Sequence, residues 1–161
     1  IKEVNKDTTG LWFFNSGPLA GASQPHRHIQ LLRRDPSELS CPREKWILDF
    51  DNVNYKNQRF YKNIILKKFS KTLNKENIHE IYKVLSYKLG LGKPEIDKKP
   101  RYPYNLIFTN HWMLLIKRKT DNLYGISVNA LGFAGYILVT EKSDINYLKK
   151  IGPEKLLENF L

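Results

Sequence analysis

The segment 104–118 constrains the fold most strongly, because only three residues separate two apolar runs there. The runs are Asn105–Phe108 and Trp112–Ile116, and the polar turn between them is Thr109-Asn110-His111. Two short apolar runs around a polar turn predict a β-hairpin. The chain is therefore expected to contain an antiparallel sheet.

Other segments extend this prediction. The run Leu11–Phe14 ends at a turn-forming asparagine and predicts a buried strand, and a second strand is expected over residues 26–34. Apolar residues at helical spacing predict a helix that stops at Gly90, namely Ile78, Ile81, Tyr82, Leu85 and Leu89. Residues 59–69 are ambiguous and lean towards a strand, because β-branched and aromatic residues are frequent there.

Two further segments complete the fold prediction. Residues 91–103 are polar and punctuated by proline, which indicates a mobile connection, and residues 143–161 predict two short helices joined at Gly152-Pro153. We interpret residues 1–161 as a single α+β domain, with helices packed on one side of an antiparallel sheet.

Length and composition exclude several classes of protein. A chain of 161 residues is long enough for one domain with a core. It has no apolar stretch near the roughly 20 residues that span a membrane, and no secretory signal pattern opens it. The single cysteine, Cys41, excludes an internal disulfide and fits a reducing cytoplasm. Because the sequence opens at Ile1, we interpret it as the C-terminal part of a longer chain.

The formal net charge of +11 indicates either an anionic partner or a bias in composition. A nucleic-acid-binding module is the alternative of a different class, but the lysines are scattered rather than arranged in a dense stripe with aromatics. The charge also suits a polyphosphate substrate. The dependence of binding on salt concentration distinguishes the two hypotheses. Non-specific affinity for nucleic acid falls steeply as salt rises, whereas binding in a closed nucleotide pocket changes less.

The pentapeptide His26-Arg27-His28-Ile29-Gln30 is the strongest candidate for a chemical site. On a strand, alternate side chains share a face, so His26, His28 and Gln30 are expected to point the same way. The loop just upstream, residues 16–25, is rich in glycine and small polar residues, whose backbone N–H groups can approach a phosphate closely. An imidazole that faces such a loop is what covalent nucleotidyl transfer requires.

The residue types assign roles within this pentapeptide. A neutral imidazole attacks phosphorus through one ring nitrogen when a hydrogen bond keeps the proton on the other. We expect His28 to be this nucleophile, and His26 to be its hydrogen-bond partner or an aid to the leaving group. Gln30 offers an amide that holds a phosphate oxygen but cannot titrate. A metal pair is the competing reading of the two histidines, but no third ligand stands at a telling spacing, so no metal site is expected.

Three sequence blocks carry a resemblance that covers nearly the whole chain. The first block comprises residues 15–18 and 21–30. The second comprises Tyr104-Asn105-Leu106, Thr109 and Trp112-Met113. The third comprises residues 129–135, with the sequence Asn-Ala-Leu-Gly-Phe-Ala-Gly. In this order they resemble the diadenosine tetraphosphate phosphorylases, or ATP adenylyltransferases, of the histidine-triad superfamily. The alternative within enzymes is another nucleotidyltransferase of the superfamily, such as a hexose-1-phosphate uridylyltransferase or a nucleoside-diphosphate-sugar phosphorylase.

The resemblance implies a histidine-triad-like fold. It also implies a reaction, in which inorganic phosphate cleaves diadenosine tetraphosphate to ATP and ADP through an adenylyl-histidine at His28. A divalent cation, Mg²⁺ or Mn²⁺, is expected to accompany the polyphosphate, with no covalently bound cofactor. The implied substrate-binding residues are Asn15, Gly21, Ala22, Ser23, Gln24, Gln30, Asn129, Ala130 and Leu131. Relatives are longer and carry an N-terminal portion with a substrate-binding lysine, which is expected to complete the site. The hydrolases of the superfamily commonly have a third histidine where Gln30 stands.

Overall fold

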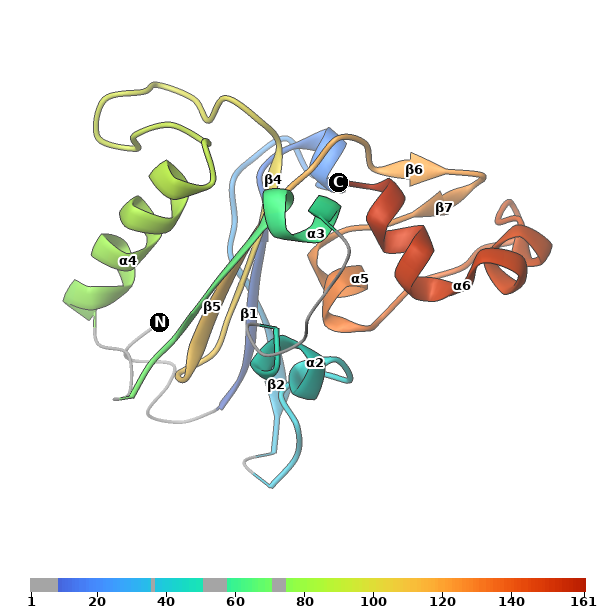
Figure 1. Cartoon of the computed structure of the whole chain (residues 1–161), viewed down its shortest axis with the longest axis horizontal. Coiled ribbons are helices and arrows are strands. Elements are labelled where there is room, and N and C mark those ends of the chain that lie inside the picture. The colour runs from blue at the N-terminus through green and yellow to red at the C-terminus, as the bar shows by residue number, and fades with distance from the viewer. Residues whose placement is uncertain (1–8, 36, 51–57, 71–74) are drawn as a thin grey trace.

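The protein, described here by a computed structural model, is built around a five-stranded antiparallel sheet with the strand order β2-β1-β4-β5-β3 (Figure 1). The structure describes residues 9–35, 37–50, 58–70 and 75–161. The five strands are β1 (Thr9–Asn15), β2 (Gln30–Arg34), β3 (Ile64–Lys68), β4 (Tyr104–Phe108) and β5 (Trp112–Lys117). A separate ribbon pairs β6 (Asn122–Leu123) with β7 (Ile126–Ser127).

Helices cover both faces of the large sheet. The helical elements are η1 (Pro18–Ala20), α2 (Glu44–Leu48), α3 (Gln58–Asn63), α4 (Lys75–Lys88), α5 (Ala130–Ala134) and α6 (Ile145–Asn159). Figure 1 shows α4 on one side of the sheet, and α2, α5 and α6 on the other. The α+β class with helices against an antiparallel sheet is confirmed, and α4 adds a layer on the opposite face.

The alternation of side chains along the strands explains this arrangement. Leu11 and Phe13 of β1 join a core cluster with residues of α2, α5 and α6, whereas Trp12 and Phe14 join a second cluster with Leu85 of α4. Strands β4 and β5 alternate in the same way, and all eleven of their residues except Lys117 are buried. Strands that are apolar on both faces require cover on both faces.

The ends of several predicted elements differ from the structure. The expected strand over residues 26–34 begins only at Gln30, so His26 and His28 precede the ladder. Residues 59–69 are not one strand, because α3 occupies the chain up to Asn63 and β3 follows directly. The kink predicted in the C-terminal helical segment is confirmed at Gly152, whose φ of 76° interrupts the helix.

The connection after α4 contains no helix or strand. It is nevertheless anchored, because Leu91 is 1% exposed and its carbonyl accepts a hydrogen bond of 2.9 Å from the Arg101 N–H. The mobility expected for residues 91–103 stays a prediction.

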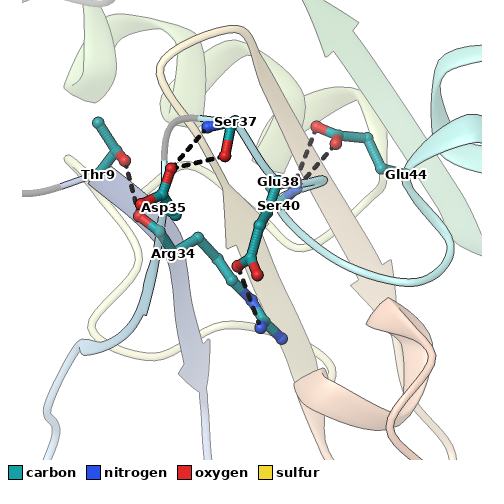
Figure 2. A network of polar contacts seen from close by, with 7 residues as sticks. All are labelled: Thr9, Arg34, Asp35, Ser37, Glu38, Ser40 and Glu44. Atoms are coloured by element: carbon teal, nitrogen blue, oxygen red, sulfur yellow. Dashed lines mark hydrogen bonds and ion pairs between the residues drawn. The ribbon is translucent and has the colours of Figure 1, made fainter.

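Polar contacts fasten the segment that follows β2 (Figure 2). The Thr9 hydroxyl donates to the Arg34 carbonyl over 2.9 Å, which joins the ends of β1 and β2. Ser40 donates to the Glu44 carboxylate through its N–H and its hydroxyl, at 2.8 and 2.7 Å. The same carboxylate accepts a hydrogen bond of 3.1 Å from Trp112 Nε1, so the start of α2 is tied to β5.

Cys41 is part of the core rather than of a site. It is 1% exposed, and burial raises the pKa of its thiol to about 11. The thiol is therefore protonated at neutral pH and is a poor nucleophile. Among the described residues, no helix is both long and apolar enough to cross a membrane.

Candidate active site

The predicted loop folds into a compact turn at the end of β1. The Ser16 N–H donates to the Tyr104 carbonyl over 3.0 Å, and the Ser16 hydroxyl accepts from the Tyr104 N–H over 2.8 Å. Proline at the first helical position favours the short 3₁₀ turn η1 that follows. Gly21 then closes the turn in the left-handed conformation, with φ at 79°.

The backbone amides of this loop divide into two groups. The N–H groups of Ala20, Gly21 and Ala22 donate to carbonyls of Gly17 or Pro18 within the loop itself. Within the described part of the chain, the N–H groups of Ser23 and Gln24 donate to no protein acceptor, and both residues are exposed. Fewer backbone N–H groups are therefore available for a phosphate than the sequence indicates, and those that are lie at the downstream end of the loop.

Asn15 joins the loop to the Asn-Ala-Leu segment, although more than a hundred residues separate them in sequence. Its Oδ1 accepts a hydrogen bond of 2.9 Å from the Ala130 N–H and one of 2.7 Å from Asn105 Nδ2. Asn129 caps α5 by accepting from the Leu131 N–H over 2.9 Å. The structure thus brings together Asn15, Asn129, Ala130 and Leu131.

Gly21 is packed against the same segment. A Cβ at this position would lie 2.7 Å from Asn129 Cβ and 2.9 Å from the Val128 carbonyl oxygen. The positive φ adds strain for any residue other than glycine. Only glycine therefore lets the loop approach the start of α5 this closely.

Gly21→Ala is expected to lower the free energy of unfolding by about 2 kcal/mol, combining left-handed strain with the clash against Asn129. Urea denaturation of the variant and the parent chain measures the difference. Gly17→Ala is the matched control, since its φ of 172° is extended and no atom lies within 4 Å of the added Cβ. Equal losses in both variants would contradict the packing argument.

The two histidines lie side by side ahead of β2. Their ring centroids are 5.0 Å apart, and His28 Nδ1 lies 3.2 Å from the backbone carbonyl oxygen of His26. Because a carbonyl oxygen can only accept, this hydrogen bond requires the proton on Nδ1 of His28. In the neutral form of the imidazole the lone pair is then on Nε2. His28 is half-buried and His26 is exposed.

Gln30 is the first residue of β2 and is paired with Phe13 of β1. Residues opposite each other across a ladder share a face, so Gln30 lies on the face of Phe13, which is covered by α5. Asn15 hydrogen-bonds the start of α5 on this same face. The end of β1 and the start of β2 therefore bring Asn15 and Gln30 to one end of the sheet, with the histidines immediately upstream.

A buried polar network supports this end of the sheet, and sequence reasoning missed its role. Asn105 is fully buried, and its Nδ2 donates to Asn15 Oδ1 and, over 2.8 Å, to the Ala20 carbonyl. Arg118 is 3% exposed and donates to Asn105 Oδ1 and to the carbonyls of Thr120 and Val128. An asparagine inside an apolar strand was the available signal, because a buried amide requires partners.

Arg118 is a buried cation with aromatic neighbours. Its guanidinium carbon lies 5.0 Å from the ring centroid of Phe133 and 5.3 Å from that of Phe160. Burial lowers the pKa of Arg118 to about 10, so the side chain is still charged at neutral pH. The network fixes the loop, Asn15 and α5 relative to one another.

The described residues contain no group of three His, Cys, Asp or Glu side chains placed to hold a metal ion. The assignment of substrate-binding roles to the loop, Gln30 and the segment 129–131 stays a prediction, as does the nucleophilic role of His28.

Two sequence families match the chain. The Ap4A phosphorylase N-terminal domain matches residues 2–47, and the ATP adenylyltransferase C-terminal domain matches residues 42–160. Protein APA1 of Saccharomyces cerevisiae is 23% identical over 176 residues, which cover 100% of this chain and 54% of that protein.

Solved structures of yeast Ap4A phosphorylase Apa2 share the fold. The complex of Apa2 with Ap4A matches with a TM-score of 0.60 and 18% identity, over 98% of this chain and 55% of that one. The complex with AMP matches with a TM-score of 0.58 and 18% identity, over 91% and 53%. The chain spans about half the length of these relatives. By the matches over both of its parts, the chain belongs to the Ap4A phosphorylase family of ATP adenylyltransferases.

Proposed function

We propose that this chain carries the nucleophile and part of the nucleotide site of an Ap4A phosphorylase, which converts diadenosine tetraphosphate (Ap4A) and inorganic phosphate into ATP and ADP. The observation that carries the proposal is the hydrogen bond from His28 Nδ1–H to the His26 carbonyl, which in the neutral imidazole leaves the lone pair on Nε2. Family membership supports the same reaction.

The reaction follows in two displacements. In the first, the lone pair of His28 Nε2 attacks the α-phosphorus of Ap4A, a P–N bond forms, and the bond to the bridging oxygen breaks to release ATP. In the second, an oxygen of inorganic phosphate attacks the adenylyl group, the P–N bond breaks, and ADP leaves with the imidazole restored. Donors that absorb the developing negative charge lower the barrier of both steps. The N–H groups of Ser23 and Gln24 are suited to this role because no protein acceptor in the described chain engages them.

A divalent cation is expected to enter on the polyphosphate rather than in a preformed protein site.

The proposal is tested by incubating the full chain with Ap4A labelled in the α-phosphate and isolating the protein. We expect an acid-labile adduct that maps to a peptide containing His28 and that is discharged as ADP on addition of phosphate. A labelled peptide without His28, or an adduct that phosphate does not discharge, would overturn the proposal.

Gln30→His is expected to shift the second step from phosphate towards water. The amide of Gln30 cannot transfer a proton, whereas an imidazole on the same face of β2 can activate water. The ratio of AMP to ADP formed from Ap4A in the presence of phosphate is expected to rise about tenfold or more. Chromatography of the products measures the ratio, with Gln30→Asn as the non-titrating control. The same ratio in all three proteins would refute this account of Gln30.

A further inference from the structure

A cavity of about 130 Å³ lies on the face of the sheet that α4 covers, away from α5. Phe14 and Tyr104 of the sheet line it, together with Tyr82 and Ser86 of α4 and parts of the segment 91–100. Arg27 closes it on the side of the histidine segment. None of the substrate-binding positions discussed above is among the residues that line this cavity.

The floor of the cavity is aromatic with a neutral polar centre. The rings of Phe14 and Tyr104 lie 5.7 Å apart, and those of Tyr82 and Tyr104 lie 6.2 Å apart. The two tyrosine hydroxyls share a hydrogen bond of 2.7 Å. Burial, with the neighbouring Tyr82, raises the pKa of Tyr104 above its usual range, so this phenol stays protonated. Such a floor suits a flat ring that also carries polar atoms.

The rim of the cavity is cationic. Arg27, Lys98 and Lys99 all line it, and within the described part of the chain none of the three forms an ion pair. Among the described residues that line the cavity, Asp97 is the only carboxylate. It accepts a hydrogen bond of 2.6 Å from the Lys93 N–H, and its Oδ2 lies 3.9 Å from Arg101 Nη2. The rim therefore offers excess positive charge around an apolar floor.

We propose that this cavity is a binding site for a small organophosphate with a planar ring, the chemical class to which mononucleotides belong. The ring occupies the aromatic floor, and the phosphate lies at the rim beside Arg27, Lys98 and Lys99. Lys and Arg bind phosphate through charge-assisted hydrogen bonds. The lining includes Ser16 of the loop and Arg27 of the pentapeptide, but not His26, His28 or Gln30, and the proposal does not depend on the proposed function.

The test is an NMR titration of the full ¹⁵N-labelled chain with AMP. We expect saturating shifts of the amides of residues 92, 93, 98 and 99, and a loss of affinity of about tenfold in the double variant Lys98→Glu/Lys99→Glu. The matched control is Lys149→Glu/Lys150→Glu, which changes the net charge equally on exposed residues of α6, across the sheet from the cavity. The control is expected to bind as the parent chain does.

Three outcomes overturn the proposal. The first is an absence of shifts at these amides up to about 1 mM AMP. The second is an affinity for AMP that the glutamates at 98 and 99 leave unchanged. The third is an equal affinity for inorganic phosphate, which would exclude a role for the ring. Shifts of residues 21–24 in the same spectra report the candidate active site separately. A failure at one site is thus distinguishable from a failure at the other.

Discussion

His28→Ala is expected to lower the rate of ATP release from Ap4A by at least about 10⁴-fold, because the variant lacks the atom that forms the P–N bond. The fold is expected to survive, since His28 is only half-buried and its described hydrogen bond is to the neighbouring carbonyl of His26. Product chromatography gives the rate, and circular dichroism during heating gives the melting temperature, which is expected to change little.

His111→Ala is the matched control, since His111 is exposed in the turn between β4 and β5 and lies at the other end of β4 from Asn105. It is expected to keep the activity of the parent chain. Phosphorolysis at a comparable rate in His28→Ala would remove the nucleophile from the proposed mechanism, whatever the control does.

Asn105→Leu is expected to have the largest effect on stability and to lower the free energy of unfolding by about 3 kcal/mol. The leucine keeps the branching of the asparagine side chain, but it removes one acceptor of the buried Arg118 guanidinium and the donor to the Ala20 carbonyl. For a chain of this length the melting temperature is expected to fall by about 6–12 °C. Asn15 also loses a partner, so nucleotide affinity is expected to fall.

A double-mutant cycle separates the network from general damage to the core. Arg118→Leu is expected to cost less in the Asn105→Leu background than in the parent chain, because the two side chains share a hydrogen bond. Asn122→Leu, at an exposed position of β6, is the control and is expected to change the free energy of unfolding little. Strict additivity of the Asn105 and Arg118 substitutions would show that the two residues act independently.

The sheet could be predicted largely from the sequence because its strands are short, apolar and bounded by turns. The hairpin of β4 and β5 and the strand β1 are confirmed by the structure. The presence of helices on both faces of the sheet was harder to foresee. The unbroken apolar run from Leu11 to Phe14 nevertheless indicates it, because consecutive residues of a strand face opposite sides of the sheet. The same pattern explains why α4 lies apart from the other helices.

Other features could not be predicted, because they depend on contacts between distant segments. The histidines precede β2, since the ladder with β1 ends at the pair Phe13 and Gln30. The boundary between α3 and β3 was obscured because the aromatic residues of α3 run directly into the β-branched residues of β3, and both types favour strands. The pairing of Asn105 with Asn15 and Arg118 required the fold itself, because sequence spacing gives no sign of it.

The strand order also bears on how the chain acquires its structure during synthesis. Strands β1 and β2 are made first, yet β1 receives its second neighbour, β4, only about ninety residues later, as the Asn15–Asn105 contact shows. Until β4 is made, the edge of β1 that β4 covers in the finished sheet lacks this partner, and an unpaired strand edge is prone to aggregation. A nick between residues 50 and 58 would yield two pieces that share a single sheet, so we expect them to fold by fragment complementation rather than separately.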